Sequence, residues 1–192
     1  MNHDAVREAI CLAGKRLWEA RLIVATEGNL SARIGPDRIL ATPSGIEKGL
    51  LTTEMLIECP LDSVANGVSS EIEMHQALYR RDPGLGAVVH AHPLQATAVV
   101  TCGLELPYDL TPESEDVLGP IAHVGFAMPG TPEVAAEISA TPVDCRTYLL
   151  SHHGAVTTGK DVLDALRRME TLERVAELFV ACRPLGGARP RG

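Results

Sequence analysis

Two histidines, His90 and His92, stand one residue apart at the end of the apolar run AVVHAHP. In a β-strand, side chains at positions i and i+2 point to the same face of the sheet, so the two imidazoles would project together. That spacing allows both rings to bind one metal ion. It is also compatible with two polar residues that close a strand near solvent, so further donors must decide between the two interpretations.

A second apolar run, TYLLSHHG, also ends in imidazoles, at His152 and His153. Neighbouring residues of a strand point to opposite faces, so only one of these two can join the first pair. The pattern of residues leaves open which of them does so. Three imidazoles with an open fourth position are typical of a catalytic zinc site rather than a closed structural one. The histidines therefore predict metal-dependent chemistry.

A carboxylate that could complete the site lies in a predicted helix over residues 70–82. At 100° per residue the apolar side chains of this helix form one arc, and Glu71 falls near its centre. A buried carboxylate requires a cation, hydrogen-bond donors or a raised pKa, so Glu71 is expected to have an internal partner. Glu73 lies on the solvent side, where a capping box with Ser70 accounts for it. His75 also lies in the apolar arc, and we expect a hydrogen-bonded core residue there rather than a ligand.

Three short stretches upstream of the histidine pair carry neutral hydrogen-bond donors: EGNLS, TPSG and VSSE. Glycine lets backbone N–H groups approach an anion, and hydroxyl and amide side chains add further donors. The serine pair also precedes a predicted helix, whose N-terminus favours negative charge. Turn and cap chemistry accounts for each stretch alone, whereas the combination favours a phosphate site. The candidate donors are Gly28, Asn29, Ser31, Thr42, Ser44, Gly45, Ser69 and Ser70.

The composition is that of a soluble globular protein of one domain. The chain has 192 residues, of which 45% are apolar and 22% charged, and its formal net charge is −8. An acidic chain argues against general binding to nucleic acid or to a membrane surface, so an anionic substrate would need a local pocket of donors. We expect neither a signal peptide nor a spanning helix. The five scattered cysteines form no C-x-x-C pair, which predicts reduced thiols and a cytoplasmic protein.

The elements that must position these residues alternate between strands and helices. Helices are expected over 5–23 (with Asp4 as its cap), 70–82, 93–102, 131–139 and 161–182. Strands are expected over 30–34, 38–42, 55–59, 87–92, 120–128, 147–154 and 155–159, and a loop over 109–119. This order predicts a single-domain α/β layered sandwich over residues 1–182, with a largely antiparallel central sheet covered by helices. Residues 183–192 are expected to form a flexible basic tail.

With these residues in place, the chain resembles the class II aldolase/adducin family. The resemblance is carried by GNLSAR, TPSG, SSEIEMHQALYRRDPGLGAVVHAHP and SHHGAVTTGKDVLDAL, and it extends from about residue 8 to residue 182. It implies a zinc-dependent enzyme with a central, largely antiparallel sheet covered by helices. It also implies a homotetramer with active sites at the subunit interfaces and a small phosphorylated sugar as substrate.

The same resemblance assigns roles to single residues. It implies that one Zn²⁺ per subunit is bound by His90, His92 and His153, so that His153 rather than His152 is the third ligand. Glu71 is implied to be the catalytic acid/base and to bind the zinc when no substrate is present. The implied cradle for the substrate phosphate consists of Gly28, Asn29, Ser44, Gly45, Ser69 and Ser70.

The activity implied by the resemblance is reversible cleavage of a ketose 1-phosphate to dihydroxyacetone phosphate and an aldehyde. L-Fuculose 1-phosphate and a 5-deoxypentulose 1-phosphate are the expected substrates. Zinc would polarise the carbonyl as a Lewis acid while Glu71 moves a proton.

Related members epimerise ribulose 5-phosphate, dehydrate methylthioribulose 1-phosphate or decarboxylate sugar-acid phosphates, and the shared residues do not separate these reactions. An adducin-like binding domain or a zinc scaffold without turnover would be a non-catalytic alternative. An adducin-like binding domain would be expected to have lost the metal ligands, whereas His90, His92, His153 and Glu71 are all present. The tyrosines of the family's aldehyde end do not align, since Tyr108 is shifted and the C-terminal segment contains none. The aldehyde and its proton donor are therefore left open.

Overall fold

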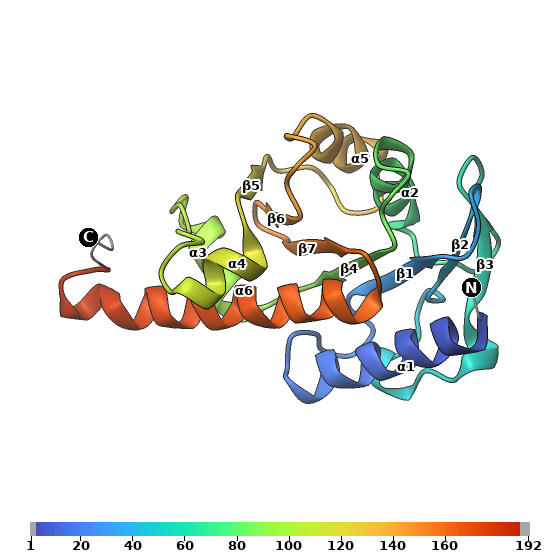
Figure 1. Cartoon of the computed structure of the whole chain (residues 1–192), viewed down its shortest axis with the longest axis horizontal. Helices are drawn as coiled ribbons and strands as arrows, with labels where there is room; N and C mark the ends of the chain where they lie inside the picture. Colours follow the sequence, from blue (N-terminus) through green and yellow to red (C-terminus); the bar gives the residue numbers. More distant parts are fainter. Residues whose placement is uncertain (1–2, 189–192) are drawn as a thin grey trace.

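A single open β-sheet forms the centre of the molecule, with helices on both of its faces (Figure 1). The computed structural model describes residues 3–188, and within that range seven strands form the sheet and six α-helices surround it. The strand order is β3-β2-β1-β4-β7-β6-β5. Neighbouring strands are antiparallel except β5 and β6, which are parallel. The expected α/β sandwich with a largely antiparallel sheet is confirmed.

The strands are β1 (Asn29–Arg33), β2 (Arg38–Ala41), β3 (Ile57–Pro60), β4 (Ala87–Ala91), β5 (Ile121–Val124), β6 (Thr147–Leu150) and β7 (Gly154–Gly159). The α-helices are α1 (His3–Glu19), α2 (Ile72–Arg81), α3 (Leu94–Thr101), α4 (Pro112–Leu118), α5 (Pro132–Ser139) and α6 (Val162–Cys182). Short 3-10 helices are formed by Lys48–Leu50, Thr53–Met55 and Arg183–Leu185.

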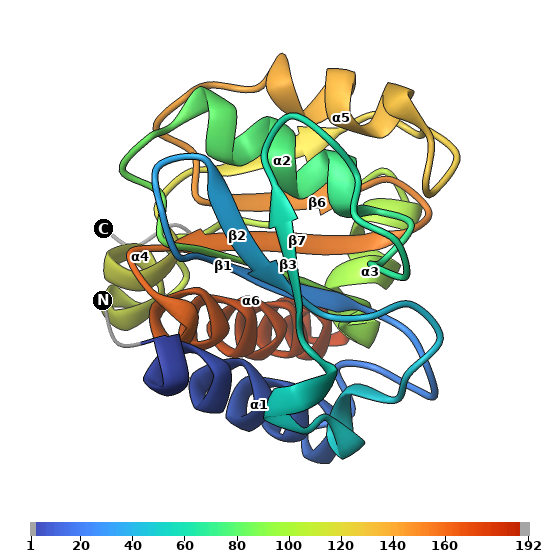
Figure 2. The same ribbon diagram turned by 90° about the vertical axis from the view of Figure 1, so that its right-hand side faces the viewer.

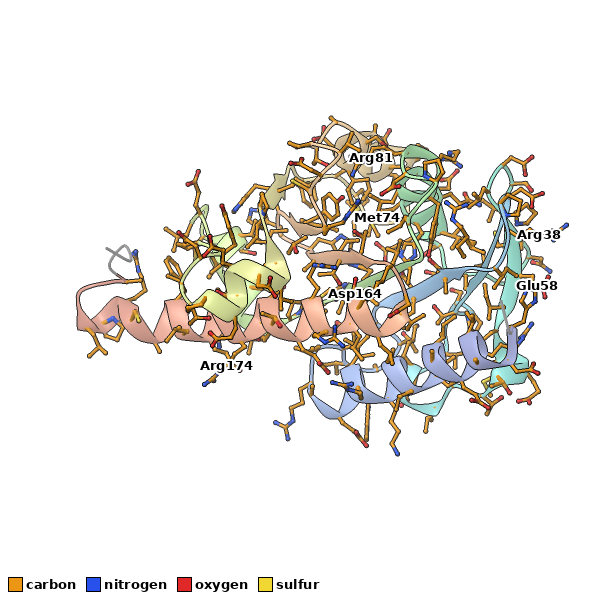
Figure 3. All side chains as sticks on the ribbon, viewed as in Figure 1. Arg38, Glu58, Met74, Arg81, Asp164 and Arg174 are labelled. Atoms are coloured by element: carbon orange, nitrogen blue, oxygen red, sulfur yellow. The ribbon has the colours of Figure 1, made fainter. Side chains whose placement is uncertain are left out.

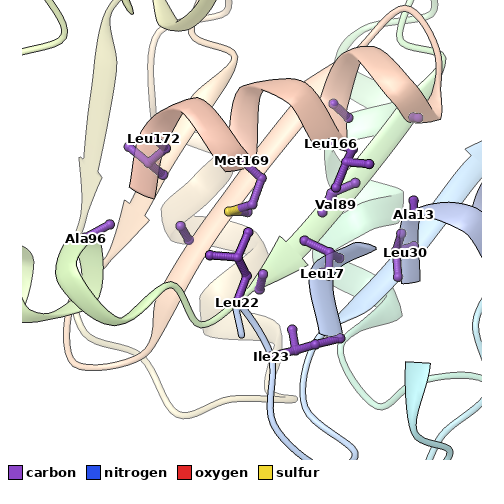
Figure 4. Close-up of a cluster of buried hydrophobic side chains, with 14 of the residues drawn as sticks. Ala13, Leu17, Leu22, Ile23, Leu30, Val89, Ala96, Leu166, Met169 and Leu172 are labelled. Carbon is purple, nitrogen blue, oxygen red and sulfur yellow. The ribbon is translucent and has the colours of Figure 1, made fainter. Parts of the chain in front are cut away.

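Two apolar clusters pack the two faces of the sheet, because successive side chains of a strand point to opposite faces. In β4, Val89 belongs to the cluster on the side of α1 and α6, whereas Val88 belongs to the cluster on the side of α2 and α5. Figure 2 shows these two helix pairs on opposite sides of the sheet. Met74 of α2 is buried against one face (Figure 3), and Leu166 and Met169 of α6 are buried against the other (Figure 4).

The loop expected over residues 109–119 contains a helix, so that prediction was wrong. Thr111 and Ser114 form a reciprocal capping box at the start of α4, and Pro112 occupies its first turn. The segment has little apolar periodicity, which is why the pattern of residues did not indicate a helix. Its buried Leu118 supplies the tertiary contact that the sequence pattern did not show.

The predicted helix that contains Glu71 starts later than expected. Glu71 is the N-cap residue of α2, and no side chain caps this end, so the predicted capping box of Ser70 and Glu73 is wrong. The cause lies just upstream, where the backbone N–H of Ser69 donates to the carbonyl of Thr42 at 3.2 Å. This cross-connection keeps the serine pair out of the helix and beside the end of β2.

The two ends of the chain differ in part from the expectation. Asp4 lies in the first turn of α1 instead of capping it. After α6, residues 183–185 form a 3-10 turn, whereas residues 189–192 of the predicted flexible tail lie outside the described residues. The boundary at residue 182 stays a prediction. Within the described range, no helix is long and apolar enough to cross a bilayer.

A carboxylate from a distant helix caps α3. Glu173 of α6 is buried and accepts hydrogen bonds from the backbone N–H groups of Gln95 and Ala96, at distances between its oxygens and the nitrogens of 2.9, 3.1 and 3.0 Å. Burial raises its pKa, and the backbone donors lower it in part. Because α3 follows His92 and Pro93 directly, this cap fixes the chain just beyond the histidine pair.

A buried polar network lies between β1 and α2. The hydroxyl of Ser31 is 2.7 Å from Nδ1 of His75 and 3.1 Å from the hydroxyl of Tyr79, and all three side chains are buried. Burial is the main cause that lowers the pKa of His75 to about 3, and the charge of His90 lowers it further. The expectation that His75 is a hydrogen-bonded core residue is confirmed.

His75 should make the stability of the protein fall in acid. In the unfolded chain an imidazole titrates near pH 6.5, whereas the folded state keeps His75 neutral down to about pH 3. Between these values the unfolded state binds one more proton. The free energy of unfolding therefore falls as the pH drops below about 6.5, by up to about 1.4 kcal/mol per pH unit from this group. Urea unfolding of the metal-free protein at pH 5 and pH 7 measures this, and His75→Gln should reduce the difference between the two pH values. Equal differences in both proteins would show that His75 is not the group responsible.

Candidate functional site: a histidine cluster beside donor-rich loops

His90, His92 and His153 form one cluster at the end of β4. Their candidate ligand nitrogens all lie within 4.8 Å of one another. The ring centroids are 4.9, 4.7 and 5.1 Å apart. The Nε2 atoms of His90 and His92 are separated by 3.2 Å, so the two side chains project together as the strand spacing predicted.

A tight turn decides which of the two later histidines joins the pair. His152 and His153 lie between β6 and β7, and the N–H of His153 donates to the carbonyl of Leu150 at 3.1 Å. His152 has a φ of 55°, is exposed, and places its ring 6.2 Å from that of Phe126. The apolar pattern predicted a strand at these residues, and the structure has a turn. The geometry brings His153, and not His152, into the cluster.

The register between β4 and β7 brings His153 alongside the histidine pair. Ala91 pairs with Ala155, so the residue that precedes β7 arrives next to His92. The approach is close enough to require glycine at the first position of β7. A Cβ atom on Gly154 would lie 2.5 Å from the carbonyl oxygen of Ala91 and 2.7 Å from Cδ2 of His92.

Glu71 completes the cluster from the start of α2, and only 13% of its side chain is exposed. Its Oε2 atom lies 3.3 Å from Nε2 of His90 and accepts a hydrogen bond of 2.9 Å from the side-chain amide of Asn29. Its Oε1 atom lies 3.3 Å from Nε2 of His153. Burial alone would raise the pKa of Glu71. The neighbouring His90 and His153, together with the amide of Asn29, outweigh burial and hold that pKa well below its usual range.

Several bare acceptor atoms face one another in this cluster. Nδ1 of His90 lies 2.9 Å from the carbonyl oxygen of Ala155, and a carbonyl can only accept, so the hydrogen of the neutral ring is on Nδ1. In this neutral form, Nε2 of His90 presents a lone pair to the carboxylate of Glu71. Oε1 of Glu71 and Oδ1 of Asn29 are likewise buried without a hydrogen-bond partner. Such an arrangement is repulsive unless a proton or a metal ion lies between the atoms.

The donor set fits a divalent metal ion. Burial is the largest cause that lowers the pKa of His92, and burial followed by the charge of His90 lowers that of His153 to about 4. Both rings are therefore neutral near pH 7, which is the form that binds metals. Three imidazole nitrogens and one carboxylate are ligands that zinc accepts. The assignment of these residues as ligands stays a prediction.

The three donor-rich stretches lie together beside the histidines. β1 pairs with β2, which brings Gly28 and Asn29 next to the segment after β2. Pro43 forms an antiparallel bridge with Val68, and the N–H of Ser44 donates to the carbonyl of Gly67 at 2.9 Å. The TPSG and VSSE stretches are therefore side by side. Of the six predicted cradle residues, Ser44, Gly45 and Ser70 are exposed or partly exposed, and Gly28, Asn29 and Ser69 are buried.

Two other donors in these stretches have structural tasks instead. Ser31 belongs to the buried network with His75, and the hydroxyl of Thr42 accepts a hydrogen bond of 3.1 Å from the N–H of Leu30. Gly28 has a φ of 69°, and a Cβ atom there would lie 2.8 Å from the carbonyl oxygen of His90. Its lack of a side chain lets the loop pack directly on the histidine strand.

Two charged residues that the sequence pattern did not indicate lie beside the cluster. Lys48 is buried, and its ammonium group donates to the carbonyls of Thr26 and Ile46 at 2.7 and 2.9 Å. Burial lowers its pKa, which the negative charge of Glu71 partly offsets. The sequence feature that could have indicated Lys48 is its position three residues after the donor-rich stretch TPSG. Glu27 was also missed, because a carboxylate inside a stretch interpreted as an anion cradle offers no donor to a phosphate.

Comparison with known proteins agrees with this arrangement. A profile described as "Class II Aldolase and Adducin N-terminal domain" matches residues 8–180. The 3-oxo-tetronate 4-phosphate decarboxylase of Haemophilus influenzae is 32% identical over 186 residues, which cover 93% of this chain and 89% of that protein. The methylthioribulose-1-phosphate dehydratase of Gluconobacter oxydans is 35% identical over 181 residues, with coverage of 85% and 86%.

A solved structure shows the same fold. The crystal structure of L-fuculose-1-phosphate aldolase from Thermus thermophilus superposes with a TM-score of 0.86 at 33% sequence identity and covers 97% of this chain and 98% of that one. The profile match spans most of the chain, and these relatives are similar along most of their own length. The chain therefore belongs to the class II aldolase and adducin family.

Proposed function

We propose that the protein is a zinc-dependent aldolase that reversibly cleaves a ketose 1-phosphate to dihydroxyacetone phosphate and an aldehyde. The proposed substrate is L-fuculose 1-phosphate or a 5-deoxypentulose 1-phosphate. Membership of the family makes the chain a metal-dependent lyase that acts on a small phosphorylated sugar. The observation that carries the proposal is the convergence of three histidines on Glu71, one oxygen of which is buried without a hydrogen-bond partner, next to three loops rich in neutral donors.

Each part of the site then has a chemical task. When bound, zinc would supply Lewis-acid polarisation of the substrate carbonyl. His90, His92 and His153 hold the ion, and the backbone and side-chain donors of the cradle bind the phosphate. The hydrogen bond from Asn29 holds one oxygen of Glu71 and leaves the other without a donor. In the direction of condensation, the ionised Glu71 takes a proton from carbon 3 of dihydroxyacetone phosphate, and that carbon attacks the aldehyde. In cleavage the same carboxyl group returns the proton.

The related reactions are the alternative within the same family. The H. influenzae relative is named as a decarboxylase and the G. oxydans relative as a dehydratase, and both are about as similar to this chain as the aldolase structure is. Epimerisation of ribulose 5-phosphate is a further alternative, and a non-catalytic adducin-like domain the least favoured.

Product analysis separates these reactions. The zinc-loaded protein should release dihydroxyacetone phosphate from one of the candidate ketose 1-phosphates, measured with a coupled glycerol-phosphate dehydrogenase. Metal analysis should give one zinc per chain, and removal of zinc with a chelator should abolish the release, which added Zn²⁺ restores. Release of carbon dioxide from a sugar-acid phosphate, or dehydration of methylthioribulose 1-phosphate, without any aldol cleavage would contradict the aldolase proposal.

Glu71→Gln should lose activity and keep the fold. The amide cannot take the proton, so the turnover number should fall by about 10²- to 10⁴-fold. The matched control is Glu73→Gln, two residues further along and only partly buried, which should keep near-normal turnover. Circular dichroism checks the fold of both variants. Undiminished turnover in Glu71→Gln would remove this residue from the mechanism.

We also propose a homotetramer in the cytoplasm with active sites at the subunit interfaces. The proposed interface is supported by exposed apolar side chains near the histidines. Leu94, Phe126 and Met128 are 69%, 59% and 62% exposed. Phe126 contacts His152, and Leu94 follows His92 by two residues.

Analytical ultracentrifugation should give a mass four times the 20.5 kDa of one chain. The double change Phe126→Glu and Met128→Glu should dissociate the assembly, because it places charge in the proposed interface. The exposed Leu185, replaced by Glu, is the control. A wild-type protein that sediments as a monomer would contradict the proposal.

A further inference from the structure

The segment between α1 and β1 wraps around the second histidine of the pair. The backbone N–H of His92 donates to the carbonyl of Leu22 at 2.9 Å. At the other end of the segment, Gly28 packs on the backbone of His90. Between these two contacts, Oε1 of Glu27 lies 3.5 Å from Nδ1 of His92. Both the main chain and the ring of His92 therefore contact the same short loop.

Glu27 is held in place by its own loop. Its N–H donates to the carbonyl of Val24 at 3.0 Å, and its Oε2 atom accepts a hydrogen bond of 3.0 Å from the N–H of Val24. Ala25 has a φ of 50°, in the left-handed region, so the turn is tight. The buried ammonium of Lys48 ties the neighbouring carbonyl of Thr26. One oxygen of Glu27 is thus occupied, and the other faces the imidazole.

The orientation of the ring follows from these contacts. The Nε2 atom of His92 lies at the centre of the cluster, 3.2 Å from that of His90. When Nε2 of a neutral imidazole binds a metal, the ring hydrogen can lie only on Nδ1. That hydrogen would face the carboxylate of Glu27, and a shift of about half an ångström brings the two atoms to hydrogen-bond distance. His90 has a carbonyl, that of Ala155, in the corresponding position.

We propose that Glu27 is a positioning residue for the metal centre, which accepts a hydrogen bond from Nδ1 of His92 and thereby fixes its Nε2 atom towards the ion. The inference rests on the proposed zinc site. A carboxylate behind a histidine ligand orients the ring and increases its basicity, and loss of such a partner costs about 10- to 100-fold in metal affinity. Glu27 does not touch the reacting atoms. It acts through His92.

The test is the dissociation constant for zinc, measured by competition with a chromophoric chelator in the absence of substrate. Glu27→Ala removes the acceptor and should bind zinc about 10- to 100-fold more weakly than the wild type. The N–H of Val24 and Nδ1 of His92 lie against two different oxygens of Glu27. Glu27→Gln keeps an oxygen at only one of these two positions, so its zinc affinity should lie between those of Glu27→Ala and the wild type.

The matched control is Glu58→Ala. Glu58 lies on the edge strand β3 (Figure 3), its side chain is 45% exposed compared with 43% for Glu27, and it forms one ion pair, with Arg7, at 3.5 Å. The substitution makes the same change in net charge and should leave the zinc affinity within about twofold of the wild type. Urea unfolding of the metal-free proteins gives the second measurement, and its midpoint should stay close to the wild type in both Glu27 variants.

Each outcome has one meaning. Zinc affinity in Glu27→Ala equal to that of Glu58→Ala would overturn the inference. Loss of zinc affinity in step with a lower unfolding midpoint of the metal-free protein would also overturn it, because a loop that merely supports the fold predicts that result. A wild-type protein that binds no zinc would instead refute the proposed metal centre, so the two failures are distinguishable.

Discussion

The arrangement of the whole site depends on the close approach of the ring nitrogens of three histidines to the buried carboxylate of Glu71. Nδ1 of His90 is committed to a backbone carbonyl, which leaves its Nε2 atom bare in front of the carboxylate of Glu71. The second oxygen of that carboxylate lies 3.3 Å from Nε2 of His153. A folded chain tolerates such a cluster only if a proton or a metal ion lies between its atoms, because buried lone pairs without a partner cost free energy. The fold holds these groups together where the end of β4, the turn before β7 and the start of α2 meet.

The sheet supplies the precision that the cluster needs. Antiparallel pairing of β4 with β7 sets His153 beside the pair, and Gly154 permits the backbone approach. On the other side, β1 pairs with β4 and carries Asn29 opposite His90. Residues far apart in the chain therefore meet on one strand end, with apolar clusters filling both faces of the sheet behind them. A substrate phosphate would therefore bind to hydrogen-bond donors of the predicted cradle, in loops that backbone hydrogen bonds already hold in position.

Charge is distributed unevenly around the site. The chain has a net charge of −8, yet the predicted phosphate cradle offers backbone N–H groups, hydroxyls and an amide, with the buried ammonium of Lys48 nearby. Carboxylates lie on the metal side instead, where Glu71 faces the ring nitrogens and Glu27 faces the outer nitrogen of His92. An acidic protein can in this way bind an anionic sugar phosphate, because the local donors and the metal determine the potential there.

Features of the site that depend on local periodicity were predictable from the amino-acid sequence. The shared direction of His90 and His92 was predictable, since the strand repeat fixes which side chains share a face. Glu71 points inward as expected, but it does so as the N-cap residue of α2 and not from within the helix. Tertiary structure decided the rest. The choice of His153 needed the turn and the register of β7, and the late start of α2 came from a hydrogen bond to Thr42, far away in sequence. The places of Lys48 and Glu27 depend on loops that pack against the histidine strand. The sequence of these loops has no periodic pattern that would predict their contact with the histidine strand, because that contact arises only when the sheet brings distant segments together.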